Sequence, residues 1–295
     1  MKVGIPRGLL YCRYNKFIET FFSELGAEII TSPDTNKNIL DLGIKYCVDE
    51  ACLPMKVFHG HTACLKDKCD IIFIPRIMQL YKDEYICPKF CGLTEMIKND
   101  IPGLPPVTSY PIYGWNRSHM EKWAKATGGL FTKNNFKIKK ALALAIAANI
   151  NTTGIENQDK FTYKAALAGH PYNIHDPFVN MNLIKKLNKL DIGVFTEESA
   201  DPADINNEIK IFYKRPFWTF ARNSYGFTSN LARNKRINGI IYVSSFGCGA
   251  DSIIVELIKN RLPDFPFLLL KIDEQTGEAG LDTRIEAFKD MLERR

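Results

Sequence analysis

The chain has 295 residues, 45% of them hydrophobic, which is enough for two α/β lobes with sizeable cores. Its net charge of +6 is mild and its basic residues are mixed with acidic ones, which argues against a nucleic-acid-binding class. Neither a secretory signal nor a run of about 18 apolar residues occurs, so we expect a cytoplasmic protein without a membrane partner.

The first half of the chain alternates between strand and helix patterns. We expect strands over 2–6, 27–31, 70–76 and 107–113. We expect helices over 14–26, 36–43, 54–65 and 93–99, and a long polar loop over 77–92. Residues 116–150 are predicted to form two helices broken at 127–129, and 151–161 to form a polar linker.

The second half repeats this alternation. Strands are expected over 164–169, 193–196, 238–245 and 266–273, and helices over 178–190, 217–235, 251–260 and 282–294. Strands that alternate with helices predict parallel sheets with crossover helices. The fold class is therefore α/β, with two Rossmann/flavodoxin-like lobes and a helical bridge. The predicted divisions are an N-terminal lobe over 1–115, a helical bridge and linker over 116–160, and a C-terminal lobe over 161–295.

Eight cysteines are the most informative residues. In a cytosolic protein they indicate metal binding or catalysis rather than disulfides. Cys248 lies between two glycines where a strand is expected to turn into a helix, and a helix N-terminus favours the thiolate. A buried packing cysteine and a phosphate-binding loop are the alternatives, although the segment has no P-loop pattern.

Cys52 precedes a proline that suits a first helical turn, and Cys87 begins a Cys-Pro dipeptide in a polar loop. Cys-Pro is frequent around iron–sulfur ligands. Cys91 follows in the same loop, where an incidental surface cysteine is an open alternative. Three other cysteines are predicted to be core or incidental residues: Cys47, Cys64 and Cys69. Cys12 lies in a turn after the first strand, at the same edge of the sheet, and its role stays open.

Thiolates select zinc, copper(I) or iron–sulfur clusters. Structural zinc usually takes paired cysteines in a small domain, whereas single candidates spread over two lobes suit a cluster in a cleft between them. His59 and His61 lie two positions apart, so they do not share a helix face and a joint metal site is not expected. His170 and His175 lie on a loop after a strand. Two roles stay open for them: polar contacts within the loop, or a substrate-binding or supporting role at the site.

Several segments together resemble the acyl-CoA dehydratase activase-related family, which is related to 2-hydroxyacyl-CoA dehydratase subunits and double-cubane cluster proteins. The resemblance runs nearly end to end. It is carried by 4-GIPRGLLYCRY-14, 52-CLPMKVFHGH-61, 71-IIFIPR-76, 87-CPKFCGL-93, 168-AGHPYNIHDP-177, 245-SFGCGADS-252 and 273-DEQTGEAGLDTRIEAF-288.

This resemblance implies two lobes that hold a [4Fe-4S] or larger double-cubane cluster through Cys52, Cys87 and Cys248, with Cys91 as a fourth candidate. It also implies a partner, an ATP-hydrolysing iron–sulfur activator that injects a low-potential electron for elimination of water from a 2-hydroxyacyl-CoA. The chain has no P-loop or other recognisable ATP site, so we do not expect it to be the activator itself.

The leading hypothesis is an iron–sulfur enzyme component of the dehydratase type, or an ATP-dependent reductase component, acting on an acyl-CoA or another small molecule. One alternative is a non-catalytic electron carrier or cluster-carrying partner of a larger dehydratase complex. A second is a metal-free α/β protein that binds an acidic metabolite. We expect a homodimer or heterodimer in each case.

Overall fold

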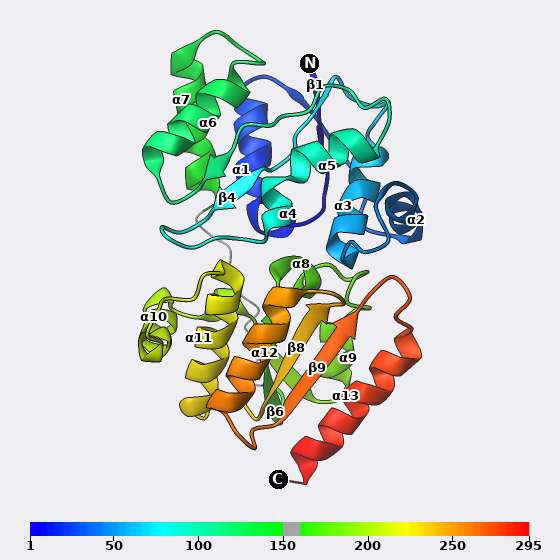
Figure 1. Ribbon diagram of the computed structural model, residues 1–295, viewed down its shortest axis with the longest axis vertical. Coiled ribbons are helices and arrows are strands. Elements are labelled where there is room, and N and C mark those ends of the chain that lie inside the picture. Colours follow the sequence, from blue (N-terminus) through cyan, green and yellow to red (C-terminus); the bar gives the residue numbers. More distant parts are fainter. Residues whose placement is uncertain (150–159, 295) are drawn as a thin grey trace. The chain divides into compact units, whose positions relative to one another are not determined.

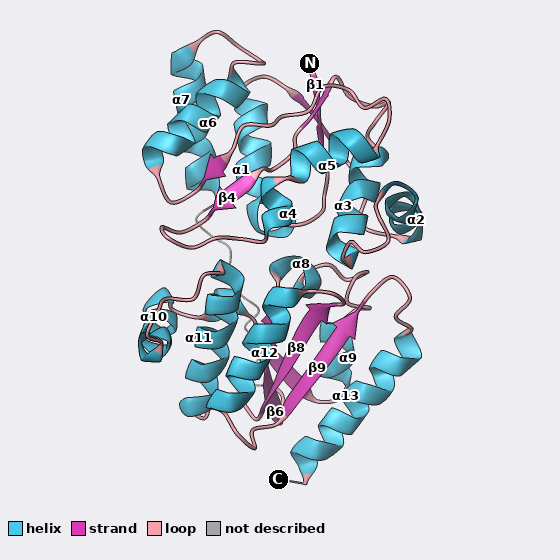
Figure 2. Ribbon diagram, in the orientation of Figure 1, coloured by secondary structure: helices cyan, strands magenta, loops and turns pink. Residues whose placement is uncertain are grey.

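The computed structural model describes residues 1–149 and 160–294, and most of the predicted linker lies outside these residues. The chain divides into two compact units, Met1–Thr152 and Thr153–Arg295. Each unit contains its own parallel sheet with helices packed around it (Figures 1 and 2), so the predicted α/β class with parallel sheets is confirmed.

The N-terminal unit is built on a sheet of three parallel strands in the order β2-β1-β3. Strands β4 and β5 form a separate, two-stranded parallel sheet. The strands are β1 (Lys2–Ile5), β2 (Glu28–Thr31), β3 (Ile71–Ile72), β4 (Ile77–Gln79) and β5 (Ile112–Tyr113).

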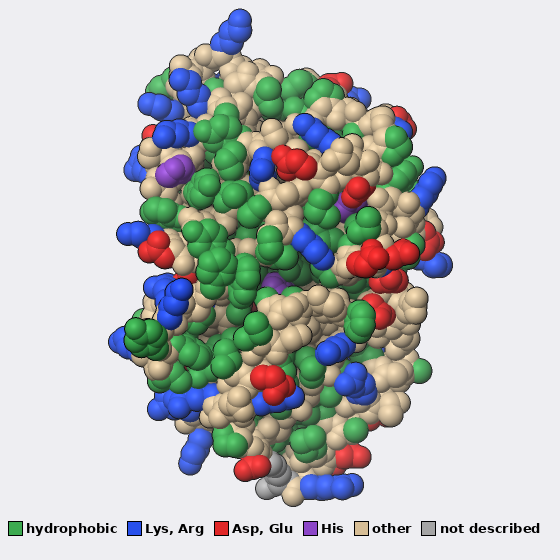
Figure 3. Space-filling view, viewed as in Figure 1, with side chains coloured by type: hydrophobic (Ala, Val, Ile, Leu, Met, Phe, Trp, Pro, Cys, Tyr) green, Lys and Arg blue, Asp and Glu red, His purple; other side chains and the backbone are tan. Residues whose placement is uncertain are grey.

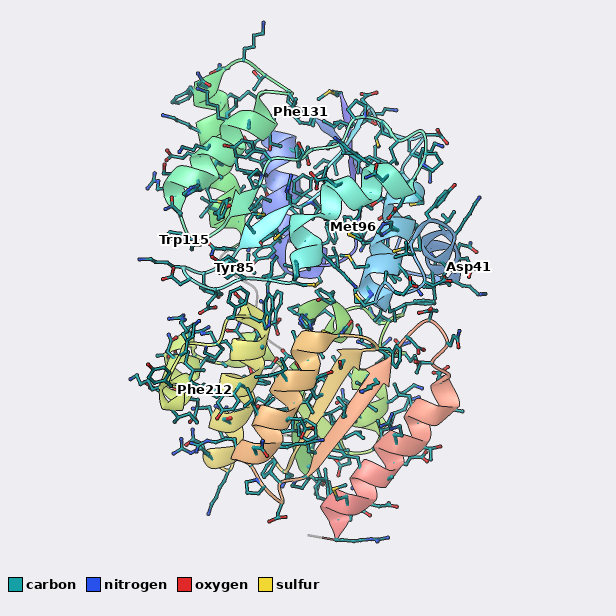
Figure 4. All side chains as sticks on the ribbon, viewed as in Figure 1. Asp41, Tyr85, Met96, Trp115, Phe131 and Phe212 are labelled. Carbon is teal, nitrogen blue, oxygen red and sulfur yellow. The ribbon has the colours of Figure 1, made fainter. Side chains whose placement is uncertain are left out.

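Seven helices surround these strands in the described part of this unit. They are α1 (Tyr11–Glu24), α2 (Lys37–Tyr46), α3 (Leu53–Ala63), α4 (Pro88–Cys91), α5 (Leu93–Asp100), α6 (Arg117–Gly128) and α7 (Asn135–Ala148). Aromatic packing holds α6 and its following loop against α1. The rings of Phe21 and Trp123 are 4.7 Å apart, and Phe131, labelled in Figure 4, lies 5.3 Å from Phe22.

Helices α2 and α3 are packed backbone to backbone. A Cβ atom at Gly43 would lie 1.9 Å from the carbonyl oxygen of Lys56, and one at Gly60 would lie 1.8 Å from that of Ile39. Any side chain larger than hydrogen would push the helices apart, so these two glycines fix the distance between α2 and α3.

The C-terminal unit contains one sheet of four parallel strands in the order β7-β6-β8-β9. Its strands are β6 (Tyr163–Gly169), β7 (Ile192–Phe195), β8 (Gly239–Ser245) and β9 (Phe267–Ile272). Its helices are α8 (Pro171–Ile174), α9 (Leu183–Lys189), α10 (Pro202–Glu208), α11 (Thr219–Arg233), α12 (Gly249–Arg261) and α13 (Glu278–Glu293), with 3-10 turns η1 (Glu197–Ser199) and η2 (Ile209–Ile211).

Helices cover both faces of this sheet (Figure 1). On one face, Tyr242 of β8 belongs to a buried apolar cluster with residues of α11 and α12. Phe212, labelled in Figure 4, packs on Tyr225 of α11 with ring centroids 4.7 Å apart. Helices α9 and α13 are joined by Lys186, whose ammonium group binds Asp282 at 2.5 Å.

In both units the chain runs from the first strand to a neighbour on one side and then crosses to the other side. The order β2-β1-β3 and the order β7-β6-β8-β9 share this reversal. Ligands of such folds bind where the strand order reverses, at the carboxyl ends of the first and third strands. In the C-terminal unit those ends lead into His170 and into the loop that carries Cys248.

Some predicted elements differ from the structure in length. The strand expected over 70–76 is limited to β3. Beyond it, the Ile74 N–H donates to the side-chain oxygen of Thr108, and Pro75 has no N–H group to donate. The helix expected over 178–190 begins only at Leu183, because Met181 and Asn182 have positive φ angles of 54° and 57°. The loop expected over 77–92 contains β4 and α4.

The visible surface carries basic and acidic side chains side by side rather than one large basic face (Figure 3). Among the described residues, no helix combines the length and apolar character that crossing a membrane requires.

Candidate metal-binding cysteines

Each of the three predicted ligands is the N-cap residue of a helix. Cys52 precedes α3, Cys87 precedes α4 and Cys248 precedes α12. None of the three thiols caps its helix with a side-chain hydrogen bond. A helix N-terminus presents N–H groups that by themselves favour a negatively charged sulfur over a thiol. At Cys87 burial outweighs this effect, and the pKa of the thiol lies above its ordinary value.

The N-terminal unit brings Cys52, Cys87 and Cys91 into one group with Lys89. The Lys89 ammonium group lies 3.7 Å from Cys52 Sγ. Burial raises the pKa of the Cys87 thiol; the Lys89 amide and ammonium groups lower it, and the neighbouring sulfurs of Cys52 and Cys91 raise it. Two predicted ligands from loops 35 positions apart thus converge, with a cation beside them.

The remaining cysteines of this unit show packing roles or lie at the surface. Burial, with the nearby Asp100 carboxylate, raises the pKa of Cys47 to about 11. Burial also raises the pKa of the Cys64 and Cys69 thiols, which donate weakly to backbone carbonyls at 3.2 and 3.3 Å. Cys12 is exposed on α1. None of the eight cysteines, all within the described residues, forms a disulfide.

His59 and His61 are buried in α3 with separate sets of partners. His59 donates from Nδ1 to the carbonyl of Met55 at 2.7 Å, and its Nε2 faces Asp100 at 3.0 Å. His61 Nδ1 lies 2.8 Å from Ser32 Oγ, and Nε2 lies 3.0 Å from Thr35 Oγ1. Both ring nitrogens of each histidine are used in the fold, and the two rings form no joint site.

The C-terminal unit brings Cys248 together with His170 and Asp251. One ligand atom from each of these side chains lies within 4.8 Å of the others. His170 follows β6, whereas Cys248 and Asp251 follow β8, so the neighbouring strand ends create the group. Asp251 was not singled out by the sequence. Its place three residues after Cys248, in the first turn of α12, is the signal that was available.

His175, the other histidine of this loop, is paired elsewhere. Its Nε2 atom lies 2.9 Å from a carboxylate oxygen of Glu198. The two histidines at the ends of the predicted loop therefore separate, and only His170 joins the cysteine.

A cavity of about 350 Å³ lies at the strand-order reversal of the N-terminal unit. Its walls are mostly apolar. They include Ile5 at the end of β1 with Pro6 after it, and Phe73 and Pro75 after β3. This volume falls in the range of small-molecule sites. The sequence did not predict the cavity, because side chains from α1, α6 and α7 complete its walls.

A search of curated proteins finds no significant match to the chain. The family model of the CoA enzyme activase uncharacterised domain matches residues 2–200, about two thirds of the chain. This agrees with the resemblance to the activase-related family. The matched region contains the whole N-terminal unit with its convergent cysteines, and His170, but ends before Cys248. The chain belongs to the CoA enzyme activase uncharacterised domain family.

Proposed function

We propose that the chain is an iron–sulfur protein of the 2-hydroxyacyl-CoA dehydratase type that accepts low-potential electrons from an ATP-driven activator. Cys52 and Cys87 of the N-terminal unit and Cys248 of the C-terminal unit would hold the cluster, with Cys91 as a further candidate. The observation that carries the proposal is that all three thiols begin helices and that two of them already converge beside Lys89.

The donor set suits this cofactor. Sulfur ligands are those that iron–sulfur clusters require, and none of the three is committed to a disulfide or to a helix cap. When bound, a cluster with three thiolate ligands would supply one-electron chemistry and an iron with an open coordination position. Lys89 partly compensates the negative charge that deprotonated sulfurs bring into this half-buried region.

The family description also names a CoA enzyme activase, which favours a second candidate: the chain could be the ATP-hydrolysing activator itself. The full sequence contains neither a P-loop nor another recognisable ATP-binding pattern, and this supports the role of electron acceptor over that of activator. The apolar cavity supports a small-molecule substrate with an apolar body. A non-catalytic electron carrier would use the same cysteines and differ only in lacking turnover.

Anaerobic reconstitution with iron and sulfide tests the cluster. We expect a brown protein with absorption near ~400 nm, as thiolate–iron charge transfer gives. Cys52→Ser, Cys87→Ser and Cys248→Ser should each lose most of the bound iron. Cys64→Ser is the matched control, because Cys64 is the C-cap of the same helix that Cys52 begins, and it should bind iron as the natural protein does.

A colourless, iron-free protein would reject the cluster, and unchanged iron in one serine variant would reject that residue as a ligand. The loaded protein is then assayed for ATP hydrolysis alone and for turnover with an added activator and ATP. Hydrolysis by the chain alone would favour the activator, and reduction without turnover would favour the carrier.

A further inference from the structure

The carboxyl ends of β6 and β8 bring possible metal ligands together inside the C-terminal unit. Gly169 ends β6 with a φ angle of 140°, and a Cβ atom there would lie 2.3 Å from the carbonyl oxygen of Val243 on β8. Only glycine permits this approach, so the two parallel strands stay adjacent up to their ends (Figure 1). His170 follows β6 and Cys248 follows β8, so the paired strands place both at one edge of the sheet.

The side chains of His170, Cys248 and Asp251 offer three different ligand atoms to one point. A nitrogen, a sulfur and a carboxylate oxygen from them lie within 4.8 Å of one another. His170 Nδ1 and Asp251 Oδ1 are 3.2 Å apart. Two ligand atoms that each lie about 2.05 Å from a tetrahedral ion are about 3.3 Å from each other. The histidine and the aspartate therefore already have the separation that a shared ion requires.

The other oxygen of Asp251 distinguishes this arrangement from a simple hydrogen-bonded pair. Asp251 is 2% exposed. Its Oδ1 accepts from the Tyr242 hydroxyl at 2.8 Å, whereas its Oδ2 is buried and forms a hydrogen bond with none of the residues that the structure describes. Burying a carboxylate oxygen without a partner is costly, and a bound ion is one way to compensate the cost. A bond between His170 and Oδ1 leaves Oδ2 unexplained.

Two of the three side chains are held in place and the third has room to adjust. The His170 ring stacks on Tyr172 at 5.1 Å and meets the edge of Phe220 at 5.2 Å, and the Tyr242 hydroxyl holds the carboxylate. Cys248 lies between two glycines, and a Cβ atom at either glycine would meet no described atom within 4 Å. Sulfur and nitrogen ligands of one zinc ion are about 3.6 Å apart, so the sulfur has to approach by about 1 Å at most.

We propose that His170, Cys248 and Asp251 bind one Zn²⁺ ion within the C-terminal unit. Zn²⁺ accepts cysteine, histidine and aspartate ligands, whereas a thiolate disfavours Mg²⁺ and Ca²⁺. Three protein ligands leave the fourth tetrahedral position to water or to a small molecule. This site goes beyond the proposed function, because it needs no residue of the N-terminal unit. The ion and the proposed cluster compete for the Cys248 sulfur, because one thiolate cannot be the terminal ligand of both.

The test uses the full chain with Cys52→Ser, Cys87→Ser and Cys91→Ser, because these three cysteines could bind zinc themselves. This triple variant lacks two of the proposed cluster ligands, so its zinc affinity is independent of the cluster. Zinc is titrated into the metal-free triple variant in competition with a chromophoric chelator, and circular dichroism checks the fold. We expect one bound ion per chain.

Substitution of each ligand in the triple variant identifies the site. His170→Gln, Cys248→Ser and Asp251→Asn should each weaken zinc binding by at least about tenfold, the loss that removal of even a supporting group produces. His175→Gln is the matched control. His175 lies in the same unit and its Nε2 atom is 2.9 Å from a carboxylate oxygen of Glu198, so its loss should leave zinc affinity unchanged.

X-ray absorption of the zinc-loaded triple variant needs no ligand substitution, so it still applies where a ligand variant does not fold. We expect one sulfur at about 2.3 Å, with nitrogen or oxygen ligands at about 2.0–2.2 Å. A zinc shell with no sulfur, or with two, would place the ion elsewhere and reject the site. Absence of zinc binding by the folded triple variant, or unchanged affinity in any folded ligand variant, would also reject it.

Failure of this site and failure of the proposed function give different results. A natural protein that stays free of iron after reconstitution loses the cluster, but zinc binding by the triple variant is unaffected. A natural protein that loads iron beside a triple variant that binds no zinc keeps the proposed function, and His170 and Asp251 are then a hydrogen-bonded pair only.

Discussion

The His61 imidazole is buried without a carboxylate partner, so its charged form is strongly disfavoured. Burial, reinforced by the nearby Arg7 charge, lowers its pKa to about 3 from 6.5. The folded protein therefore keeps His61 neutral, with Ser32 and Thr35 hydrogen bonded to its ring. Its electrostatic environment differs from that of His170, although both rings are buried.

This difference predicts an acid-sensitive stability. Between pH 6.5 and 3 the unfolded chain binds a proton at His61 that the folded chain does not, so stability is complete above pH 6.5 and falls as the pH falls. At pH 5 the loss from this residue is about 2 kcal/mol. Urea unfolding of the natural protein and of His61→Gln at pH 7 and pH 5 measures it. An equal pH difference in both proteins would contradict the prediction.

At the scale of elements, the contact between α2 and α3 depends on two glycines. Gly60→Ala would place a methyl group within the backbone of α2 and should destabilise the protein by about 3 kcal/mol. Gly280→Ala is the opposite case, because no atom lies within 4 Å of a Cβ at this position of α13, and it should stabilise by up to about 1 kcal/mol. Thermal unfolding of both variants measures the two changes in stability. This packing account would be refuted if Gly280→Ala destabilised the protein, or if Gly60→Ala did not.

The elements that the sequence predicted well are those whose pattern is set locally. The buried strand over 238–245 became β8, and the helix expected over 217–235 became α11. The short helices α4 and α8 were missed because four residues carry no helical period, and α10 was missed among polar residues. At the site, the helix-start positions of Cys52 and Cys248 were anticipated from Pro54 and Gly249.

The parts of the site that were not anticipated depend on contacts across the fold. The approach of Lys89 to Cys52 joins residues from different helices, and no local pattern records it. Asp251 acquires its partners because β6 and β8 are adjacent, which follows from sheet order rather than from periodicity. The cavity beside β1 likewise needs three separate helices to close its walls.

At the scale of the whole molecule, the proposed ligands belong to two compact units, each with its own core. A cluster that binds only the folded protein stabilises each unit that must be folded to hold it. The gain in the free energy of unfolding is about 2.7 kcal/mol when the ligand concentration is a hundred times its dissociation constant. We therefore expect the iron-free protein to unfold in two thermal transitions and the loaded protein in one, at higher temperature.

Anaerobic calorimetry of the iron-free and the loaded protein counts these transitions. Cys248→Ser carried through the same reconstitution should still unfold in two transitions, because it should lose most of the iron. Cys64→Ser carried through the reconstitution should unfold in one transition, as the natural protein does. If loading raises only one of two transitions in the natural protein, the ligands come from a single unit.

The position of Cys248 so far along the chain also has a consequence during synthesis. Roughly 160 residues separate it from Cys87, so at 5–20 residues per second it leaves the ribosome about 8–30 seconds later. The N-terminal unit ends at Thr152, so it can be folded with Cys52 and Cys87 together only while the last roughly 96 of those residues, about 5–20 seconds of synthesis, are still being made. We therefore expect the cell to deliver iron and sulfide after translation of the chain is complete.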